Sequence, residues 1–435
     1  MSELNELSAA ELVARVQRRE LSARDTVLTN IDRIDQIESW LHAWVLVDRD
    51  GALRAADDLD ERAVRGEVLP LHGLPFGVKD IIDVEGLPTE AGFPPYRQRI
   101  ARRDASIVAR LRTLGAIPLG KTHTTQFAFS DPAPTVNPYD PARTPGGSSS
   151  GSGAAIGARS VPLALGTQTA GSVLRPAAYC GAVGFKPTFN WISRDGVLPL
   201  AWSLDHLGLL TQAAADAGLV YGALLDDPSA TSALSGAPRI AFIEEFGERS
   251  EPEVASHLHD VRSRLADAGA EMIDIRLPFE LDLLLAVHHL IMQVEVAEVH
   301  RAQVAELRES YGPAIPAEVD AGALIPAIYD QQARRLRGAL GRQVDALFDS
   351  YDALLLPTAS NVAPPRALGS TGDRTFQAPW SLLGTPAITL PTGFDTTGLP
   401  IGTQLIGRRG ADAALLRLAA WAETSLGLIA PPVFA

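Results

Sequence analysis

The 435-residue sequence contains one cysteine, Cys180, and only three lysines. A single cysteine excludes an internal disulfide and any cysteine-based metal cluster. The N-terminal segment lacks the basic and apolar regions of a signal peptide. No run of about 18 uncharged apolar residues occurs, because His288 and His289 interrupt the apolar segment around 283–294. These absences predict a soluble, cytoplasmic protein.

Basic residues are fewer than acidic residues, with 38 against 52, so the formal net charge is −14. Such a chain repels nucleic-acid backbones and anionic membranes, so we expect neither as a partner. The hydrophobic fraction of 46% and the charged fraction of 21% are those of a globular protein with a sizeable core. The length permits up to three domains, but no polar linker divides the chain. We therefore expect a single domain over residues 1–435.

The scarcity of lysine makes each lysine informative. Arginine supplies 35 of the 38 basic residues, so Lys79, Lys121 and Lys186 are not surface filling. Arginine is not deprotonated in proteins, whereas lysine can lose its proton and act as a base. We expect structural roles for Lys121 and Lys186, such as hydrogen bonds to buried carbonyls. Lys79 is either a base or a structural cation paired with Asp80.

Local patterns predict alternating helices and strands. Ser8 with Glu11 and Ser22 with Asp25 form capping boxes that open two helices. Strand, helix and strand patterns then follow one another, as in an α/β layer. We divide the domain into N-terminal helices (1–70), a catalytic core (71–215) and a variable helical region on the substrate side (about 275–348).

Two formal motif matches are poor candidates for function. Residues Gly115–Thr122 fit the phosphate-loop pattern, but a predicted helix precedes them where that motif needs a strand, and Pro118 lacks an amide hydrogen. Residues Gly147–Gly151 fit the G-x-S-x-G elbow of α/β-hydrolases, with Ser149 as the nucleophile. No strand precedes this match and no histidine follows His300. Neither a nucleotide site nor an α/β-hydrolase triad is expected.

Three residues remain as a combination. Ser148 lies in the loop GGSSSGSG, Ser172 follows it 24 residues later in GTQTAGS, and Lys79 lies upstream in an apolar segment. Each has an ordinary interpretation: a Gly/Ser run is often a flexible linker, Ser172 fits a helix cap, and a buried lysine can be structural. The loop, however, is followed at once by a core-like helix and strand, which places it inside the fold.

The sequence resembles the amidase signature family from about Leu71 to the C-terminus. The segments that carry the resemblance include GLPFGVKDIID, PGGSSSGSGAAIG, VPLALGTQTAGSVLRPAAYCGAVGFKPT, SLDHLGLLT and TPAITLPTGFDTTGLPIGTQLIGR. The resemblance implies an α/β fold with a central, mostly parallel mixed sheet covered by helices on both faces. It implies Lys79 as the base, Ser148 as a relay that follows a cis peptide, and Ser172 as the nucleophile.

The resemblance also implies an oxyanion hole and no metal or organic cofactor. The backbone amides of Thr169, Ala170, Gly171 and Ser172 match the oxyanion hole. Ser149, Gln168 and Arg175 are the supporting residues. The family's common G-T-D-T-G-G-S-I-R reads GTQTAGSVLR here, so Gln168 replaces an aspartate, Ala170 replaces a glycine and the arginine is displaced to position 175.

We therefore expect a serine amidohydrolase that cleaves the C–N bond of small-molecule amides, anilides or carbamates through an acyl-enzyme on Ser172. Urethanase-like activity belongs to this expectation, as does a free-standing monomer or homodimer. The alternative is the A subunit of a tRNA-dependent glutamyl/aspartyl amidotransferase complex. The departures at 168–175 and the charge of −14 favour the first interpretation.

Overall fold

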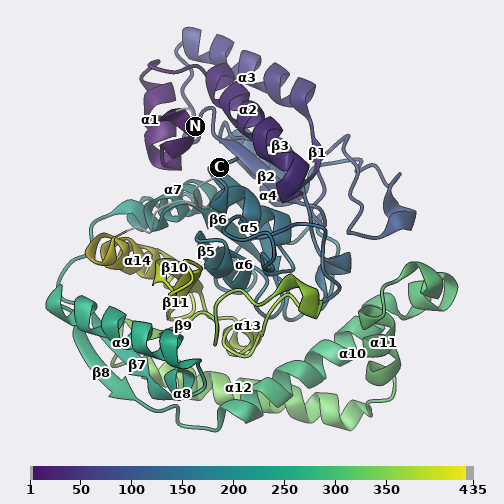
Figure 1. The fold of residues 1–435 in the computed structure, drawn as a ribbon, viewed down its shortest axis with the longest axis vertical. Coiled ribbons are helices and arrows are strands. Elements are labelled where there is room, and N and C mark those ends of the chain that lie inside the picture. Colours follow the sequence, from purple (N-terminus) through teal and green to yellow (C-terminus); the bar gives the residue numbers. More distant parts are fainter. Residues whose placement is uncertain (1–2, 428–435) are drawn as a thin grey trace.

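The computed structural model describes residues 3–427, and in this range eleven strands form one mixed sheet (Figure 1). From one edge to the other, the strands are β1 (Trp44–Val47), β3 (Ile117–Thr122), β2 (Pro75–Lys79), β4 (Leu163–Gln168), β6 (His206–Thr211), β5 (Val183–Lys186), β10 (Ala387–Phe394), β11 (Pro400–Ile406), β9 (Ala353–Pro357), β7 (Arg239–Ile243) and β8 (Glu271–Ile275).

The predicted mixed sheet flanked by helices is confirmed, with one difference. Parallel pairing joins β2 to β3 and β4, and β7 to β8 and β9. The strands between these two groups are antiparallel. The sheet is therefore not mostly parallel, because connections such as the short turn between β10 and β11 are too short for a parallel crossover.

Helices surround this sheet. They are α1 (Ala9–Gln17), α2 (Ala23–Leu41), α3 (Arg49–Val64), α4 (Ser106–Thr113), α5 (Ser150–Gly157), α6 (Leu174–Tyr179), α7 (Ala214–Leu225), α8 (Glu244–Glu248), α9 (Pro252–Asp267), α10 (Leu281–Leu307), α11 (Ala314–Gly322), α12 (Ala327–Leu347), α13 (Ala378–Leu383) and α14 (Asp412–Leu426). Single 3-10 turns occur at Glu3–Glu6, Pro94–Tyr96, Gln126–Ala128, Pro228–Thr231, Arg308–Ser310 and Arg366–Leu368.

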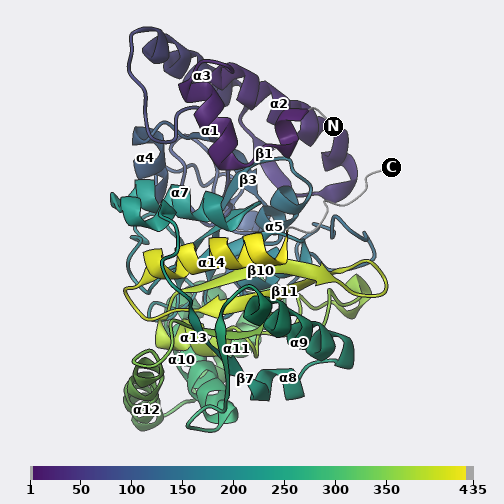
Figure 2. The same cartoon turned by 90° about the vertical axis from the view of Figure 1, so that its left-hand side faces the viewer.

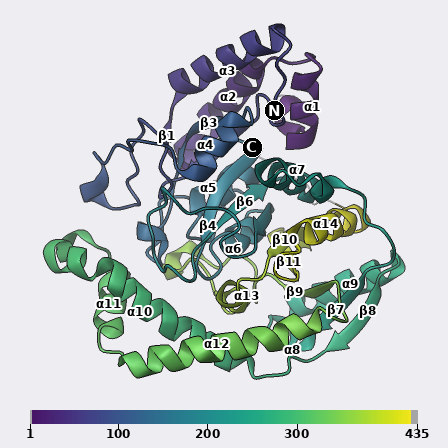
Figure 3. The ribbon, with the colours of Figure 1, turned by 180° about the vertical axis from the view of Figure 1, so that it is seen from behind.

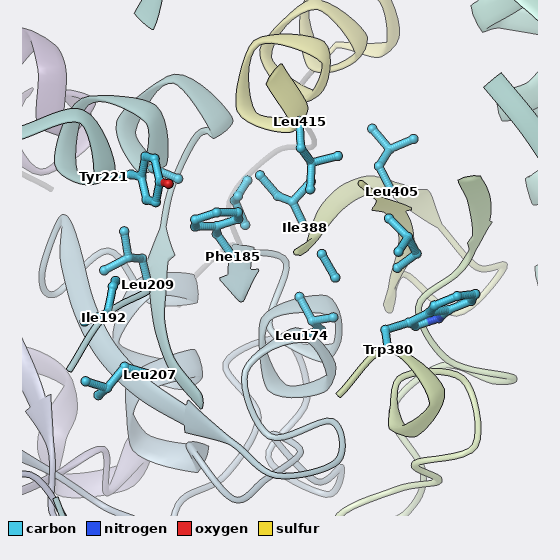
Figure 4. Packing of buried hydrophobic residues seen from close by; sticks show 14 of the residues in the cluster. Leu174, Phe185, Ile192, Leu207, Leu209, Tyr221, Trp380, Ile388, Leu405 and Leu415 are labelled. Atoms are coloured by element: carbon cyan, nitrogen blue, oxygen red, sulfur yellow. The ribbon is translucent and has the colours of Figure 1, made fainter. Parts of the chain in front are cut away.

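Two neighbouring residues of β5 show how helices cover both faces of the sheet. Successive strand residues point to opposite faces. Gly184 leaves room for Ala177 of α6 on one face, where an added Cβ would collide with the Ala177 methyl group. Phe185 points to the other face and meets the Tyr221 ring of α7 edge-on, at a centroid distance of 5.6 Å. Figure 4 shows the apolar core continuing from Phe185 and Tyr221 toward Ile388 of β10.

The N-terminal 70 residues contain a strand as well as helices. Both predicted capping boxes are confirmed, at Ser8 for α1 and at Ser22 for α2. Between α2 and α3 the chain forms β1, which pairs antiparallel with β3 at the sheet edge. The N-terminal segment is thereby hydrogen-bonded to the strand that follows β2.

Helices α10, α11 and α12 fill the region predicted to be helical, and they run along one side of the molecule (Figure 3). The helical segment Leu281–Ser310 is long and apolar enough to cross a membrane by length and composition alone. Half of its apolar window is buried, and α10 packs on α11, α12 and α13. A single helix of this kind is weak evidence of a membrane span, because a buried core helix passes the same test.

Candidate active site

The carboxyl ends of β2 and β4 bring the predicted site together. Lys79 is the last residue of β2 and Gln168 is the last residue of β4. The two strands are parallel neighbours, so both residues lie at the same edge of the sheet, where α/β proteins commonly bind ligands. The serine-rich loop reaches this edge and continues into α5 at Ser150.

Lys79 is fully buried and is held by two hydroxyl groups. Its Nζ lies 2.7 Å from Ser148 Oγ and 2.7 Å from Thr167 Oγ1, and it donates a longer hydrogen bond of 3.4 Å to the Thr167 carbonyl. Burial holds the pKa of Lys79 well below its usual range, and the negative charge of Asp205 opposes that shift only in part. An amine of lowered pKa in contact with a hydroxyl group has the properties of a general base.

Ser148 follows a cis peptide bond and is fully buried. The carbonyl of Gly147, on the other side of that bond, accepts a 2.6 Å hydrogen bond from Arg175 Nη2. Arg175 also donates to Thr371 Oγ1 at 3.2 Å, and burial lowers its pKa to about 10. The displaced arginine therefore holds the backbone next to Ser148.

Ser149 is buried beside Ser148 and bonds to the backbone of β4. Its Oγ donates to the Thr167 carbonyl and accepts from the Thr167 amide, each at 3.3 Å. The Ser149 amide in turn donates to the Ser172 carbonyl at 3.3 Å. Ser149 thus connects the serine loop, β4 and the segment that carries Ser172, and its hydroxyl does not line the cavity at Ser172.

The four carbonyls of the loop 169–172 are all held by the surrounding fold. Thr169 O accepts from His288 Nε2 at 3.1 Å, and Ala170 O accepts from Ser381 Oγ at 2.7 Å. Gly171 O accepts from the Arg175 amide and Ser172 O from the Ser149 amide. Because a carbonyl can only accept, His288 carries its proton on Nε2, and burial lowers its pKa to about 3.

The amides of the same loop have no such partners. Within residues 3–427, Ala170, Gly171 and Ser172 donate no backbone amide hydrogen bond, whereas the next two amides, of Val173 and Leu174, donate to Gln168 Oε1 at 3.0 and 3.1 Å. Fixed carbonyls beside free amides are the arrangement that an oxyanion hole requires. Ala170 does not adopt a positive φ, so its methyl group imposes no backbone penalty.

Ser172 lines a cavity of about 500 Å³ between the loop 169–172, α10, α11 and the segment 369–374. Charged side chains of both signs line it, namely Arg175, Glu318, Asp373 and Arg374. In the part of the chain that the structure describes, the Ser172 hydroxyl makes no hydrogen bond to Ser148. Catalytic hydrogen bonds often tighten only when substrate binds.

The other two lysines have the structural partners expected of them. Lys121 donates to the Pro88 carbonyl and to Thr89 Oγ1, and pairs with Asp80 at 2.8 Å. Lys186 donates to the carbonyls of Pro187 and Thr385. The interpretation of Lys79 as a cation paired with Asp80 is therefore wrong, because Asp80 is engaged by Lys121. Lys121 lies within β3, after helix α4, so the phosphate-loop match has the unsuitable context predicted for it.

The family model described as Amidase matches residues 25–416. The chain belongs to the amidase family. This confirms the resemblance drawn from the signature segments, and it supports hydrolysis of carbon–nitrogen bonds as the chemistry of this amidase.

Several known proteins are similar to this amidase along nearly its whole length. The A subunit of glutamyl-tRNA(Gln) amidotransferase from Salinispora tropica is 34% identical, with 99% of this chain and 100% of the relative covered. A solved structure described as an unexpected vestigial protein complex that reveals the evolutionary origins of an s-triazine catabolic enzyme has a TM-score of 0.90 at 29% identity, covering 98% and 100% of the two chains. A crystal structure described as amidase has a TM-score of 0.88 at 30% identity, covering 97% and 100%.

The relatives correct the expected function. The curated proteins at 31–34% identity are named as the A subunit of glutamyl-tRNA(Gln) amidotransferase, so the expectation of a hydrolase of small-molecule amides, anilides or carbamates, with urethanase-like activity, is wrong. The departures from the family motif at 168–175 do not distinguish a free-standing hydrolase from an amidotransferase subunit, as we had expected them to. Gln168 holds the loop by accepting from the amides of Val173 and Leu174, so no carboxylate is needed at that position.

The expected partners are corrected by the same finding. We expected a small-molecule substrate and no nucleic-acid partner. That expectation is contradicted by relatives that are named as the A subunit of glutamyl-tRNA(Gln) amidotransferase. The charge of −14 is a sum over the whole chain, and it does not describe any one surface or any partner chain.

Sequence reasoning missed the residues that hold the site from distant segments. Thr167, Asp205, His288, Thr371 and Ser381 contact the predicted residues directly. Thr167 stands inside the quoted motif GTQTAGS and Asp205 inside SLDHLGLLT, so the motifs contained a signal for these two. The other three lie in segments whose local pattern indicates only a helix or a loop.

Proposed function

We propose that this chain is the amide-hydrolysing subunit of an amidotransferase, which releases ammonia from a carboxamide for transfer to an acceptor held by partner chains. The observation that carries the proposal is the shared name of relatives at 31–34% identity along nearly the whole chain. The contacts of Lys79 and Ser148 and the free amides of the loop 169–172 support the hydrolytic half of that activity.

In the first step Ser172 Oγ attacks the carboxamide carbon. Its proton passes to Ser148, and the Ser148 proton passes to neutral Lys79 across the 2.7 Å contact. The carbonyl oxygen of the donor becomes an oxyanion, which the free amides of residues 170–172 stabilise. Such fixed donors are often the largest single contribution to catalysis, because they need no reorganisation during the reaction.

In the second step the C–N bond breaks. The proton held by Lys79 returns through Ser148 to the leaving nitrogen, so the nitrogen departs as ammonia and Ser172 remains acylated. Water then attacks the acyl-enzyme and gives one proton through Ser148 to Lys79, and this proton returns through Ser148 to Ser172 Oγ as the bond between Ser172 and the acyl carbon breaks. The donor leaves as a carboxylic acid, which ionises to the carboxylate in solvent. The same three side chains serve both half-reactions.

The cavity at Ser172 favours a donor that carries both charges of an amino acid. Glu318 and Asp373 suit an ammonium group, and Arg374 suits a carboxylate. A neutral anilide or carbamate would leave these groups without partners at a cost in binding free energy. Glutamine has a primary carboxamide and both charges, so we propose it as the donor.

The experiment is labelling of Ser172 by a fluorophosphonate, with competing amides added. We expect the label on the peptide that contains Ser172, protection by L-glutamine and no protection by acetanilide at the same concentration. Ammonia release from L-glutamine should be lost in Ser172→Ala and retained in Ser425→Ala, which removes a serine hydroxyl from α14, away from the residues that line the cavity. Protection by acetanilide but not by glutamine would contradict the proposed donor.

A further inference from the structure

The carboxyl group of Asp205 lies behind the loop 169–172, beside a small cavity that Thr167, Thr169 and Arg194 also line. One carboxylate oxygen, Oδ1, accepts from Thr169 Oγ1 at 2.6 Å. The other, Oδ2, accepts from the amides of Leu200 and Ala201 at 2.8 and 2.9 Å. All three partners donate, which suits an ionised carboxylate, since that group can only accept.

From this geometry we propose that Asp205 is a positioning residue of the amidase site, which fixes the first residue of the oxyanion loop and places a negative charge behind Lys79. The inference rests on the proposed function only in taking Ser172 as the nucleophile and Lys79 as its base. It is independent of which amide is the donor and of which partner chains bind.

Thr169 is fixed by two elements that approach it from different parts of the chain. Its hydroxyl donates to Asp205, which directly precedes β6, and its carbonyl accepts from His288 of α10. With the hydroxyl and the carbonyl both held, the peptide planes on either side of Thr169 have little freedom to rotate. The amides at the start of the loop therefore keep the direction that an oxyanion requires, before any substrate arrives.

The charge of Asp205 acts on Lys79 in the direction opposite to burial. Burial lowers the pKa of Lys79, and Asp205 raises it. Burial raises the pKa of Asp205, and the hydrogen bonds from Thr169, Leu200 and Ala201 together with the positive charge of Arg194 oppose that shift and stabilise the carboxylate. The charged and titratable groups around Asp205 are Lys79, Arg194 and His206, and burial keeps the pKa of His206 well below its usual range. Removing the negative charge therefore lowers the pKa of Lys79 further, so that Lys79 is neutral over a wider pH range.

The direction of this change in the pKa of Lys79 distinguishes a positioning role of Asp205 from simple loss of structure. Damage to the fold slows the reaction without moving the pH dependence toward acid. Asp205→Asn should slow the reaction, because the loop is held less well, and should also move the acid limb of the rate profile to lower pH. Thr169→Val removes the hydroxyl while leaving the aspartate, so it should slow the reaction without moving the acid limb.

The test measures the rate constant for fluorophosphonate labelling of Ser172 between pH 5 and 9. We expect a loss of about tenfold or more in Asp205→Asn and in Thr169→Val, since loss of a whole oxyanion donor costs about 100-fold or more. In Asp205→Asn the midpoint of the acid limb should move to lower pH, because the opposite charge that raises the pKa of Lys79 is lost. Thr169→Ser keeps the hydroxyl and should recover most of the rate lost in Thr169→Val, whereas Thr424→Ala, at an exposed position of α14, should label at the native rate.

An Asp205→Asn protein that labels at the native rate, or with an unmoved midpoint, would overturn the inference. If that variant fails to fold, the Thr169 pair decides: equal rates for Thr169→Val and Thr169→Ser would overturn it, and a serine variant that labels clearly faster than the valine variant would support it. Thermal unfolding of each variant verifies folding. A label on a residue other than Ser172 would overturn the proposed nucleophile instead, which distinguishes the two failures.

Discussion

The three lysines are all fully buried, yet their partners give them different chemistry. Lys121 meets a carboxylate as well as a carbonyl and a hydroxyl group, and Lys186 meets carbonyls. Lys79 meets two hydroxyl groups at 2.7 Å and one carbonyl at 3.4 Å, and no carboxylate among its hydrogen-bond partners. Carboxylates and carbonyls only accept hydrogen bonds, so they favour the ammonium form. A hydroxyl group can also donate its proton toward a neutral amine. The surroundings of Lys79 are therefore compatible with both protonation states, as proton transfer requires.

Lys79→Arg should be about as damaging as Lys79→Ala. Arginine keeps the charge and can donate hydrogen bonds, but it cannot take up a proton. We expect both variants to lose about 100-fold or more of the turnover rate, as for a missing general base. Turnover measured between pH 6 and 10 checks this, with Lys79→Met as a control for packing. Near-native turnover of Lys79→Arg would exclude Lys79 as the base.

Lys121→Met should destabilise the fold without a comparable role in the chemistry. It leaves the buried carboxylate of Asp80 without its ion-pair partner, and breaking a buried pair on one side costs about 3–5 kcal/mol. The double variant Lys121→Met/Asp80→Asn should recover much of that loss, because no unpaired charge then remains. Urea unfolding of the two variants measures the difference, and equal stability of both would argue against the pair.

At the scale of elements, local sequence patterns predict a helix or strand correctly when the residues within that element determine it. The capping boxes at Ser8 and Ser22 and the apolar strands follow from such patterns. The loop predicted across GGSSSGSG ends early, because α5 already begins at Ser150. The glycines of α5 allow close packing against the neighbouring backbone. A Cβ at Gly153 would collide with the Pro176 carbonyl, and one at Gly157 would collide with the Cys180 carbonyl. No local pattern contains that contact.

The residues of the candidate site are likewise predictable only where a local sequence motif contains them. The segments that resemble the amidase signature family contain Lys79, Ser148 and Ser172, so the reacting side chains can be named without a structure. Two of the groups that hold the oxyanion loop, His288 and Ser381, come from α10 and α13, more than 100 residues away from it. Hydrogen bonds between such distant residues depend on the folded arrangement, and the sequence pattern around His288 or Ser381 does not indicate them.

Helix α13 provides a prediction at this scale. Ser381 donates to the Ala170 carbonyl and accepts from Gln168 Nε2 at 3.0 Å, so it joins α13 to the loop at two points. Ser381→Ala should slow labelling of Ser172 about tenfold while costing only about 1–2 kcal/mol of stability, as for a buried hydrogen bond. Ser425→Ala, which removes a hydroxyl bonded to a helix carbonyl in α14, should leave labelling unchanged. A native labelling rate in Ser381→Ala would show that the loop does not need α13.

For the molecule as a whole, two buried carboxyl groups connect the beginning of the described chain to its end. Helices α7 and α14 lie side by side, with α1 above α7 in the view of Figure 2. Asp216 of α7 accepts from the Ala10 amide of α1 at 3.0 Å. Glu423 of α14 accepts from the Ala214 amide of α7 at 2.9 Å. Each carboxyl group keeps a second buried oxygen without a hydrogen-bond partner, so neither is fully compensated as an anion.

The stability of the fold should therefore fall as the pH rises toward neutrality. Burial raises the pKa of Glu423 from 4.5 to about 7 and that of Asp216 from 3.8 to about 6, and the charge of Asp216 adds to the effect on Glu423. Between the unfolded and folded pKa values the native state binds more protons than the unfolded state, so deprotonation favours unfolding over that window. The stabilisation by Glu423 is complete below about pH 4 and is lost as the pH passes through about 7.

Glu423→Gln removes this dependence at one position, because the amide stays neutral and its oxygen can still accept from the Ala214 amide. The variant should be more stable than the native chain at pH 8, by up to about 3 kcal/mol, and nearly equal to it at pH 5. Urea unfolding at both pH values measures the difference. Thr424→Ala, at the neighbouring exposed position of α14, is the control and should show no such pH dependence. A Glu423→Gln variant that loses stability equally at pH 5 and pH 8 would show that Glu423 is ionised in the native fold, because the amide would then be replacing a bound anion at both values.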